Sequence, residues 1–251
     1  MTYNSIAILQ ARMSSSRLPG KVMSIINGKP IIYWQIKRIL KSKFIDDVIV
    51  VTSIDPSDDV LVSYLTSEGI TVHRGSLNNV YSRFLEVVKK FRPKFIVRLT
   101  ADCPITMPSL IDQVIHAGLT TNSDYLSNTL IPTFPDGLDV EFIMCKAIEE
   151  LEKLALSDYE KEHVTVGIYK RADMFKVTNL ENSEDLGFLR CTLDTQEDLK
   201  FFQFLFSKFI ENEVDFDLND VLKLRDQFPN EFITNVRTSP TFLTNGSTLL
   251  T

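Results

Sequence analysis

Residues 6–21 read IAILQARMSSSRLPGK, and this stretch decides the fold. It begins with the apolar residues 6–9, which are typical of a buried strand. The polar segment that follows carries three cations, Arg12, Arg17 and Lys21. Such a loop suits a polyphosphate, because arginine forks chelate phosphate oxygens and lysine supplies a mobile point charge. The alternative is a solvated basic loop. A Walker A loop is excluded, because no glycine stands five positions before Gly20.

The composition describes an acidic globular chain. Its 251 residues allow one large domain or two small ones, and a hydrophobic content of 44% is enough for a sizeable core. The formal net charge of −6 argues against nucleic acid as a partner, but a small anion can still bind at a local positive site. We expect no signal peptide and no membrane partner, because no apolar stretch approaches the ~20 residues of a transmembrane helix.

The three cysteines are widely spaced. Cys103, Cys145 and Cys191 form no CxxC pair and no zinc-finger spacing. An odd number of such cysteines predicts reduced thiols and a cytoplasmic location.

Strands and helices alternate along the first half of the chain. Apolar runs rich in β-branched residues predict strands at 48–52, 70–72 and 95–99. Helical spacing of apolar residues predicts helices at 31–40, 58–65, 80–91 and 108–116. This order predicts an α/β fold with a mainly parallel sheet flanked by helices. Ligands bind at the carboxyl ends of the strands in such sheets, which is where the basic loop and residues 100–102 should meet.

The pattern changes in the second half. Strands are predicted at 138–142 and 188–193, and helices at 146–154 and 197–209. We interpret residues 130–185 as an inserted lobe or arm that covers the site. Residues 1–236 would form a single domain, and residues 237–251, rich in threonine and serine, a loose tail.

Two aspartates follow predicted strands. Asp102 comes directly after FIVRLTA, and Asp194 directly after LRCTL. Mg²⁺ is commonly held by one or two carboxylates together with substrate phosphate oxygens, and two strand-end aspartates could supply these. The alternative is that each carboxylate caps the helix that follows it, which is a strong alternative for Asp194.

Further polar residues stand near predicted strand ends. The acidic cluster FPDGLDVE, residues 134–141, contains Asp136, Asp139 and Glu141. The last two would share one face of a strand and could accept hydrogen bonds from sugar hydroxyls, although solvated hairpin charges are more common. Arg74, Asn78 and Arg98 are weaker candidates for the same region.

The order of the motifs resembles the spore coat polysaccharide biosynthesis protein F family of cytidylyltransferases, which is related to the acylneuraminate and 3-deoxy-manno-octulosonate cytidylyltransferases. The resemblance runs from about residue 5 to about residue 209. It is carried by ARMSSSRLPGK, GKPIIYW, VIVVTS, HRGS, NNVYSRF, VRLTADCPI, FPDGLDVE, EHVT and LDTQEDL.

The resemblance implies a Rossmann-like nucleotide-diphospho-sugar transferase fold and transfer of CMP from CTP to a sugar or sugar acid, with release of pyrophosphate. Arg12, Lys21 and Asp102 would be catalytic. The nucleotide ligands would be Arg12, Ser14, Arg17, Lys21, Arg74, Asn78 and Arg98. Asp102 and Asp194 would hold Mg²⁺, and Asp136, Asp139 and Glu141 would face the acceptor. A homodimer is a further expectation.

One position departs from the family pattern. The opening loop of the family often has glycine where this chain has Ser14. If that position needed a positive φ, serine would be unfavourable there.

Two other functions are compatible with the sequence. A glycosyltransferase of the related fold would carry a D-x-D metal motif, and the spacing of Asp136 and Asp139 does not match it. A non-catalytic nucleotide-binding subunit of a polysaccharide pathway would fit the change at Ser14, but the retained Arg12, Lys21, Asp102 and Asp194 argue against it.

Overall fold

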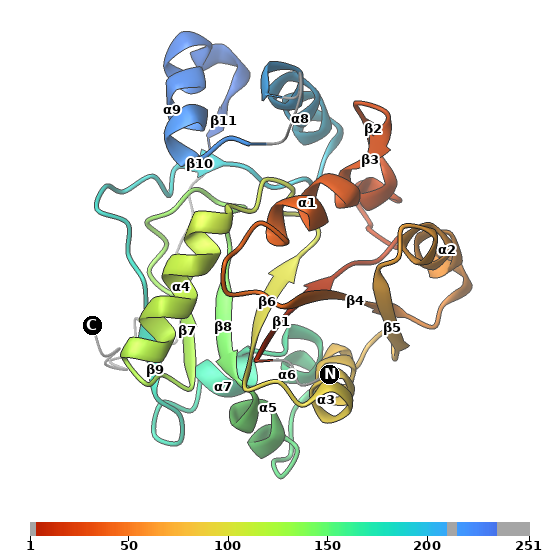
Figure 1. Ribbon diagram of the computed structural model, residues 1–251, viewed down its shortest axis with the longest axis vertical. Helices are drawn as coiled ribbons and strands as arrows, with labels where there is room; N and C mark the ends of the chain where they lie inside the picture. Colours follow the sequence, from red (N-terminus) through yellow and green to blue (C-terminus); the bar gives the residue numbers. More distant parts are fainter. Residues whose placement is uncertain (1–3, 210–214, 235–251) are drawn as a thin grey trace.

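A seven-stranded sheet with helices on both faces forms the centre of the computed structural model, which describes residues 4–209 and 215–234 (Figure 1). The strand order is β5-β4-β1-β6-β8-β7-β9. The strands are β1 (Ser5–Gln10), β4 (Asp47–Ser53), β5 (Thr71–Gly75), β6 (Phe95–Thr100), β7 (Tyr125–Ser127), β8 (Glu141–Met144) and β9 (Val177–Asn179). Only β8 is antiparallel to its neighbours in this sheet. The predicted mainly parallel α/β sheet is therefore confirmed.

The central strand β1 contributes side chains to two hydrophobic cores, one on each face of the sheet. Its side chains alternate between the faces of the sheet, so that Ala7 and Leu9 join one hydrophobic cluster while Ile6 and Ile8 join the other. The first cluster includes residues of α1 (Ile31–Ile39), α2 (Asp59–Ser67) and α4 (Pro108–Thr120). The second includes residues of α3 (Val80–Phe91), α5 (Cys145–Leu151) and α7 (Val166–Tyr169). A strand buried on both faces must be apolar at every position, which is why residues 6–9 form an unbroken apolar run.

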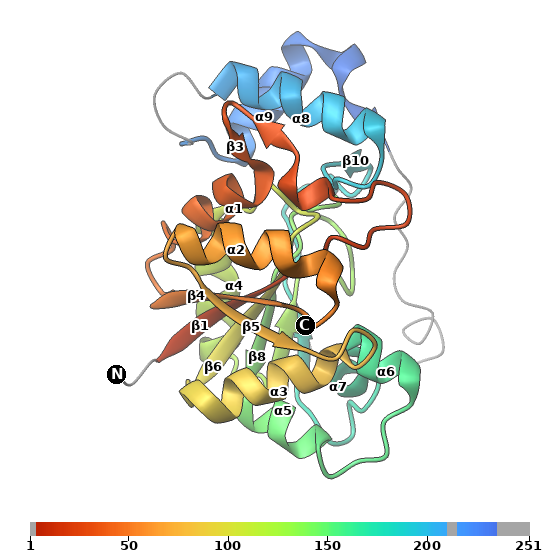
Figure 2. The ribbon, with the colours of Figure 1, turned by 90° about the vertical axis from the view of Figure 1, so that its right-hand side faces the viewer.

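A second layer lies beyond the carboxyl ends of the strands. The helix α8 (Gln196–Phe209) lies beside the hairpin of β2 (Ile25–Ile26) and β3 (Lys29–Pro30), and α9 (Leu218–Gln227) lies on the far side of α8 from that hairpin (Figure 1 and Figure 2). Trp34 joins the two parts, because its indole N–H donates to the Ile26 carbonyl at 2.8 Å and its ring contacts Phe206. This contact holds the start of the chain against its C-terminal helices. It thereby places the basic loop close to Asp194.

The second half of the chain differs from the sequence-based expectation. β8 begins at Glu141, so Asp139 lies before the strand and does not share a strand face with Glu141. Within residues 130–185, β8 and β9 belong to the main sheet, and α6 (Asp158–His163) lies beside α3, so this segment is not a separate lobe throughout. Residues 188–193 contain only β10 (Leu189–Arg190), which pairs with β11 (Ile233–Thr234) outside the main sheet. The predicted tail, 237–251, lies outside the described residues.

Among the described residues, no helix is both long and apolar enough to cross a membrane. The three cysteines are buried free thiols.

Gly118 allows α4 to pack closely on β8. A Cβ at this position would lie 2.5 Å from the ring of Phe142. We expect Gly118→Ala to lower the free energy of unfolding by about 1–3 kcal/mol, because the fully buried Phe142 ring would have to shift within the packed core. Denaturant unfolding measures this. Gly167→Ala is the matched control, because its Cβ would lie 3.2 Å from the flexible end of Leu151 in another helix. Equal stability of Gly118→Ala and the native chain would contradict the close packing.

Candidate active site

A polar cavity of about 240 Å³ opens at the carboxyl ends of β1 and β6. It is lined by the N-terminal basic loop, by the residues that follow β6 and by Asp194. The lining residues are Gln10, Ala11, Arg12, Ser15, Ser16, Arg17, Lys21, Val22, Thr100, Ala101, Asp102 and Asp194. Segments from the start, middle and end of the chain thus meet at the edge of the sheet where parallel α/β folds bind ligands.

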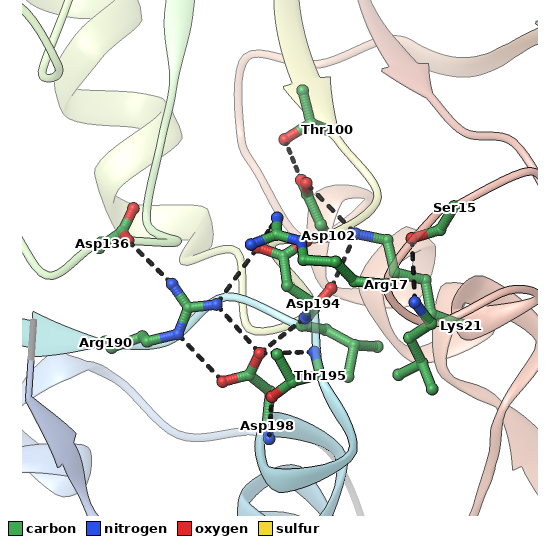
Figure 3. Close-up of polar contacts among 12 residues, drawn as sticks. Ser15, Arg17, Lys21, Thr100, Asp102, Asp136, Arg190, Asp194, Thr195 and Asp198 are labelled. Atoms are coloured by element: carbon green, nitrogen blue, oxygen red, sulfur yellow. Dashed lines mark hydrogen bonds and ion pairs between the residues drawn. The ribbon is translucent and has the colours of Figure 1, made fainter.

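Lys21 lies at the centre of this cavity. It follows Gly20, whose φ of +72° lets the loop turn back toward the sheet. The Lys21 side chain is nearly buried, and its ammonium donates to the Leu193 carbonyl at 2.7 Å and to Asp194 at 2.9 Å. The same ammonium lies 3.4 Å from Asp102. One cation therefore links two carboxylates that are far apart in the sequence (Figure 3).

Backbone contacts bring the two aspartates together. The N–H of Leu193 donates to the carbonyl of Asp102 at 2.8 Å, so the residue before Asp194 is fixed to Asp102 itself. The Thr100 hydroxyl donates to the Asp102 carboxylate at 2.6 Å and orients it. Asp102 and Asp194 therefore lie at the same cavity, as the sequence predicted.

Asp194 is surrounded by cations. Besides Lys21, Arg190 donates a hydrogen bond to it at 3.2 Å, and the Arg17 guanidinium forms an ion pair with it at 2.9 Å. Burial would raise the pKa of Asp194, but the hydrogen bond and charge of Lys21 and the charge of Arg17 lower it below its ordinary value. Asp194 is therefore a carboxylate at neutral pH.

The basic loop is anchored by Asp58, a residue that was not among the predicted site residues. This buried carboxylate accepts from the N–H of Met13 at 2.7 Å, from the Thr52 hydroxyl at 2.8 Å, and from the N–H and hydroxyl of Ser53. Burial would raise the pKa of Asp58, but these hydrogen bonds lower it overall. In the sequence, Asp58 is recognisable only as an aspartate shortly after a predicted strand. An aspartate at such a position equally indicates a helix cap.

The predicted loop residues divide into two groups. Arg12 is exposed and lines the cavity, as do Arg17 and Lys21. Ser14 is exposed and does not line it, whereas the next two serines do. Ser14 also does not adopt a positive φ, so its side chain causes no strain at the position where the family often has glycine.

Two nucleotide candidates, Arg74 and Asn78, do not line this cavity. Arg74 donates to the carbonyls of Ser53 and Asp55 and pairs with Asp59, which ties β5 to the connection after β4. Asn78 is exposed and borders a neighbouring hollow with Asn79, which caps α3.

Arg98 and Glu141 bind each other. This buried ion pair joins β6 to β8, and Glu141 also accepts from the hydroxyls of Tyr125 and Thr165. The sequence-based assignments of Arg98 to the nucleotide and of Glu141 to the acceptor differ from this arrangement, because neither side chain lines the cavity. Arg98 was predicted to lie near a strand end, and Glu141 on the face of a strand. The antiparallel register of β8 on β6, which no local pattern reveals, places them opposite each other.

The FPDG turn lies beside the site. The Asp136 N–H donates to the Leu189 carbonyl at 2.8 Å, and the Cys191 N–H donates to the Asp136 carbonyl at 2.6 Å. The next residue must be glycine, because Gly137 has a φ of +100° and a Cβ there would lie 2.2 Å from the Cys191 carbonyl oxygen. The Asp136 carboxylate faces Arg190 at 3.5 Å, whereas Asp139 is half-buried.

The pair of carboxylates fits a divalent cation. Both reach one cationic centre, the Lys21 ammonium, and carboxylate oxygens are the ligands that Mg²⁺ prefers. Across 4–209 and 215–234, no cluster of three or more acidic, histidine or cysteine side chains is present that could hold a metal.

The fold and this cavity are those of a nucleotidyltransferase, in which loop cations and two carboxylates face one polar cavity at a parallel sheet edge. A family model described as cytidylyltransferase matches residues 6–227, and the chain belongs to this family. The chain is therefore a cytidylyltransferase.

Three comparisons agree with this assignment. The spore coat polysaccharide biosynthesis protein SpsF of Bacillus subtilis is 32% identical over 230 residues, which cover 89% of this chain and 94% of SpsF. A cytidylyltransferase of Leptospira borgpetersenii superposes with a TM-score of 0.87 at 28% identity and covers 93% of this chain and 98% of its own. A CMP:2-keto-3-deoxy-manno-octonic acid synthetase, solved with CTP, shares the fold with a TM-score of 0.62 at 16% identity, over 81% of this chain and 98% of its own.

The anchoring role of Asp58 predicts a pH-dependent loss of stability. At pH 7 we expect Asp58→Asn to lower the free energy of unfolding by about 1–3 kcal/mol, because an amide cannot accept all the bonds that the carboxylate accepts. The depressed pKa means that this stabilisation is complete above the ordinary aspartate value of 3.8 and is lost as the pH falls through the folded-state pKa. The difference between the two proteins should therefore shrink at pH 3. Urea unfolding at both pH values measures it, with Asp226→Asn at an exposed aspartate as the control. A difference that is the same at both pH values would contradict the role.

Proposed function

We propose that this enzyme transfers CMP from CTP to a sugar or sugar acid, with release of pyrophosphate and with Mg²⁺ as the cofactor. The observation that carries the proposal is the Lys21 ammonium, which lies between Asp102 and Asp194 in the same cavity as Arg12 and Arg17. A triphosphate and a divalent cation need this combination of positive loop and paired carboxylates. The relative solved with CTP supports the choice of nucleotide.

The residues have separable roles in this proposal. Arg12, Arg17 and Lys21 bind the phosphates and stabilise the charge on the departing pyrophosphate. Lys21 and Arg17 would exchange Asp194 for phosphate oxygens when the nucleotide binds. Asp102 and Asp194 would hold Mg²⁺, which when bound neutralises charge on the α-phosphate.

The transfer itself is an in-line displacement. An acceptor oxygen forms a bond to the α-phosphorus while the bond from that phosphorus to the pyrophosphate oxygen breaks, and the acceptor proton passes to solvent. Such chemistry depends on positioning and charge neutralisation more than on a covalent nucleophile. The FPDG turn, with Asp136 beside the cavity residues, would face the acceptor. The names of the relatives support a sugar or sugar acid as that acceptor.

Replacement of Lys21 tests the phosphate-binding role. We expect Lys21→Ala to lower turnover by about 100-fold or more, the loss typical of removing one oriented charge donor. Pyrophosphate release from CTP with a panel of sugar acids measures this. Lys29→Ala is the control, because Lys29 pairs with Glu68 at the exposed surface. Near-normal release by Lys21→Ala would contradict the role.

Replacement of Asp102 tests the metal site. Asp102→Asn keeps the size of the side chain and the hydrogen bond from Thr100, so the fold should persist. We expect Mg²⁺-dependent turnover to be lost, because one of two carboxylate ligands is gone. Pyrophosphate release across a Mg²⁺ titration measures the loss, and circular dichroism checks the fold. A native Mg²⁺ response in this variant would rule out Asp102 as a ligand.

A further inference from the structure

Arg190 is the most highly connected cation beside the site, and the predicted site residues did not include it. Its Nε and Nη2 donate to the two oxygens of Asp198, each at 3.0 Å, and Nη2 also donates to Asp194 at 3.2 Å. Its Nη1 lies 3.5 Å from Asp136 (Figure 3). One planar guanidinium therefore contacts three carboxylates, which a lysine ammonium of similar reach could not contact in the same fixed geometry.

Asp198 fixes the backbone of the same segment. Its side chain is 2% exposed, and Oδ2 accepts from the N–H groups of Asp194 and Thr195, both at 2.8 Å. The helix cap that the sequence allowed for Asp194 is made by Thr195, whose hydroxyl accepts from the Asp198 N–H at 3.2 Å. Asp194 is thereby relieved of capping, and its carboxylate can face the cavity.

The two carboxylate oxygens of Asp194 have different partners. Oδ2 accepts from Arg190 and forms an ion pair with Arg17, whereas Oδ1 accepts from Lys21, the cation that also reaches Asp102. Arg190 thus holds one of the two oxygens from the side of β10 and α8. The other oxygen remains directed at the position shared with Asp102.

We propose that Arg190 is a positioning residue for nucleotidyl transfer, which with Asp198 orients Asp194 so that one oxygen is presented to the catalytic divalent cation. This inference rests on the proposed function, since it assigns a task within that site. Arg190 touches neither substrate nor cation in it and acts only through Asp194. Partners that orient metal ligands typically contribute about 10- to 100-fold in metal affinity or activity.

The competing explanation is that Arg190 and Asp198 only attach α8 to β10. Both explanations predict loss of stability, but only positioning predicts a change in metal binding by folded protein. Two variants separate them. Arg190→Lys keeps the positive charge but lacks the fork, and the double variant Arg190→Gln with Asp198→Asn removes both charges together, so that this pair leaves no unpaired partner of its own.

Electron paramagnetic resonance measures the dissociation constant of Mn²⁺ in the presence of CTP. The values of kcat and KM for CTP and the melting temperature are measured for each protein as well. We expect both variants to bind Mn²⁺ about 10-fold or more weakly and kcat to fall by about 10- to 100-fold. KM for CTP should change much less, because the phosphate-binding cations remain. Arg171→Gln is the matched control, since Arg171 pairs with Glu160 at similar burial away from the cavity, and its Mn²⁺ affinity should stay within about twofold of native.

Native Mn²⁺ affinity in folded Arg190→Lys or in the folded double variant would overturn the positioning role, even if melting is lowered. Equal losses in Arg171→Gln would also overturn it, because the effect would then follow from lost stability. If native protein itself neither binds Mn²⁺ with CTP nor releases pyrophosphate, the proposed function fails, and this inference fails with it. Native activity with unimpaired Arg190 variants overturns this inference alone.

Discussion

The sharing of one buried ammonium between two carboxylates is the interaction on which the site depends. Lys21 is nearly buried, and a buried cation is costly unless it is paired and hydrogen-bonded. Asp102, Asp194 and the Leu193 carbonyl meet that requirement from two other parts of the chain. The fold must therefore bring residue 194 back to the carboxyl edge of β6. The backbone bond from Leu193 to Asp102 holds it there.

Other contacts around the cavity hold the segments that carry Lys21 and Asp194 in place. Asp58 holds the basic loop through the Met13 N–H, and Trp34 holds the hairpin after the loop against α8. The Arg190–Asp198 pair holds the opposite wall. A loop that binds phosphate needs such supports, because the oriented donors otherwise lose entropy each time a substrate binds.

Three cations contact Asp194, and their different exposure bears on how a substrate could enter. Arg17 and Arg190 both pair with one of its oxygens, while Lys21 pairs with the other. Arg17 is largely exposed and Arg12 is exposed at the rim, so both can move to an incoming anion at little cost in burial. Lys21 and Arg190 are enclosed and have several partners each, so Lys21 would reach a phosphate only by exchanging Asp194 for it. The exposed cations thus lie at the entrance and the enclosed ones deeper in the site.

The sequence by itself determined the elements and one end of the site. Period-two and period-3.6 patterns are local, so the strands at 48–52 and 95–99 and the helix at 80–91 could be predicted within a few residues. The rule that parallel sheets bind ligands at their carboxyl edge then placed Arg12, Lys21 and Asp102 together. Only the tertiary structure decided which polar groups bind each other. Arg98 pairs with Glu141 because β8 runs antiparallel to β6. Asp58 accepts from the Met13 N–H, and Arg190 contacts three carboxylates. Such pairings join residues that are far apart in the chain. Local sequence spacing does not reveal them, because the distance between the partners is set by how the elements pack.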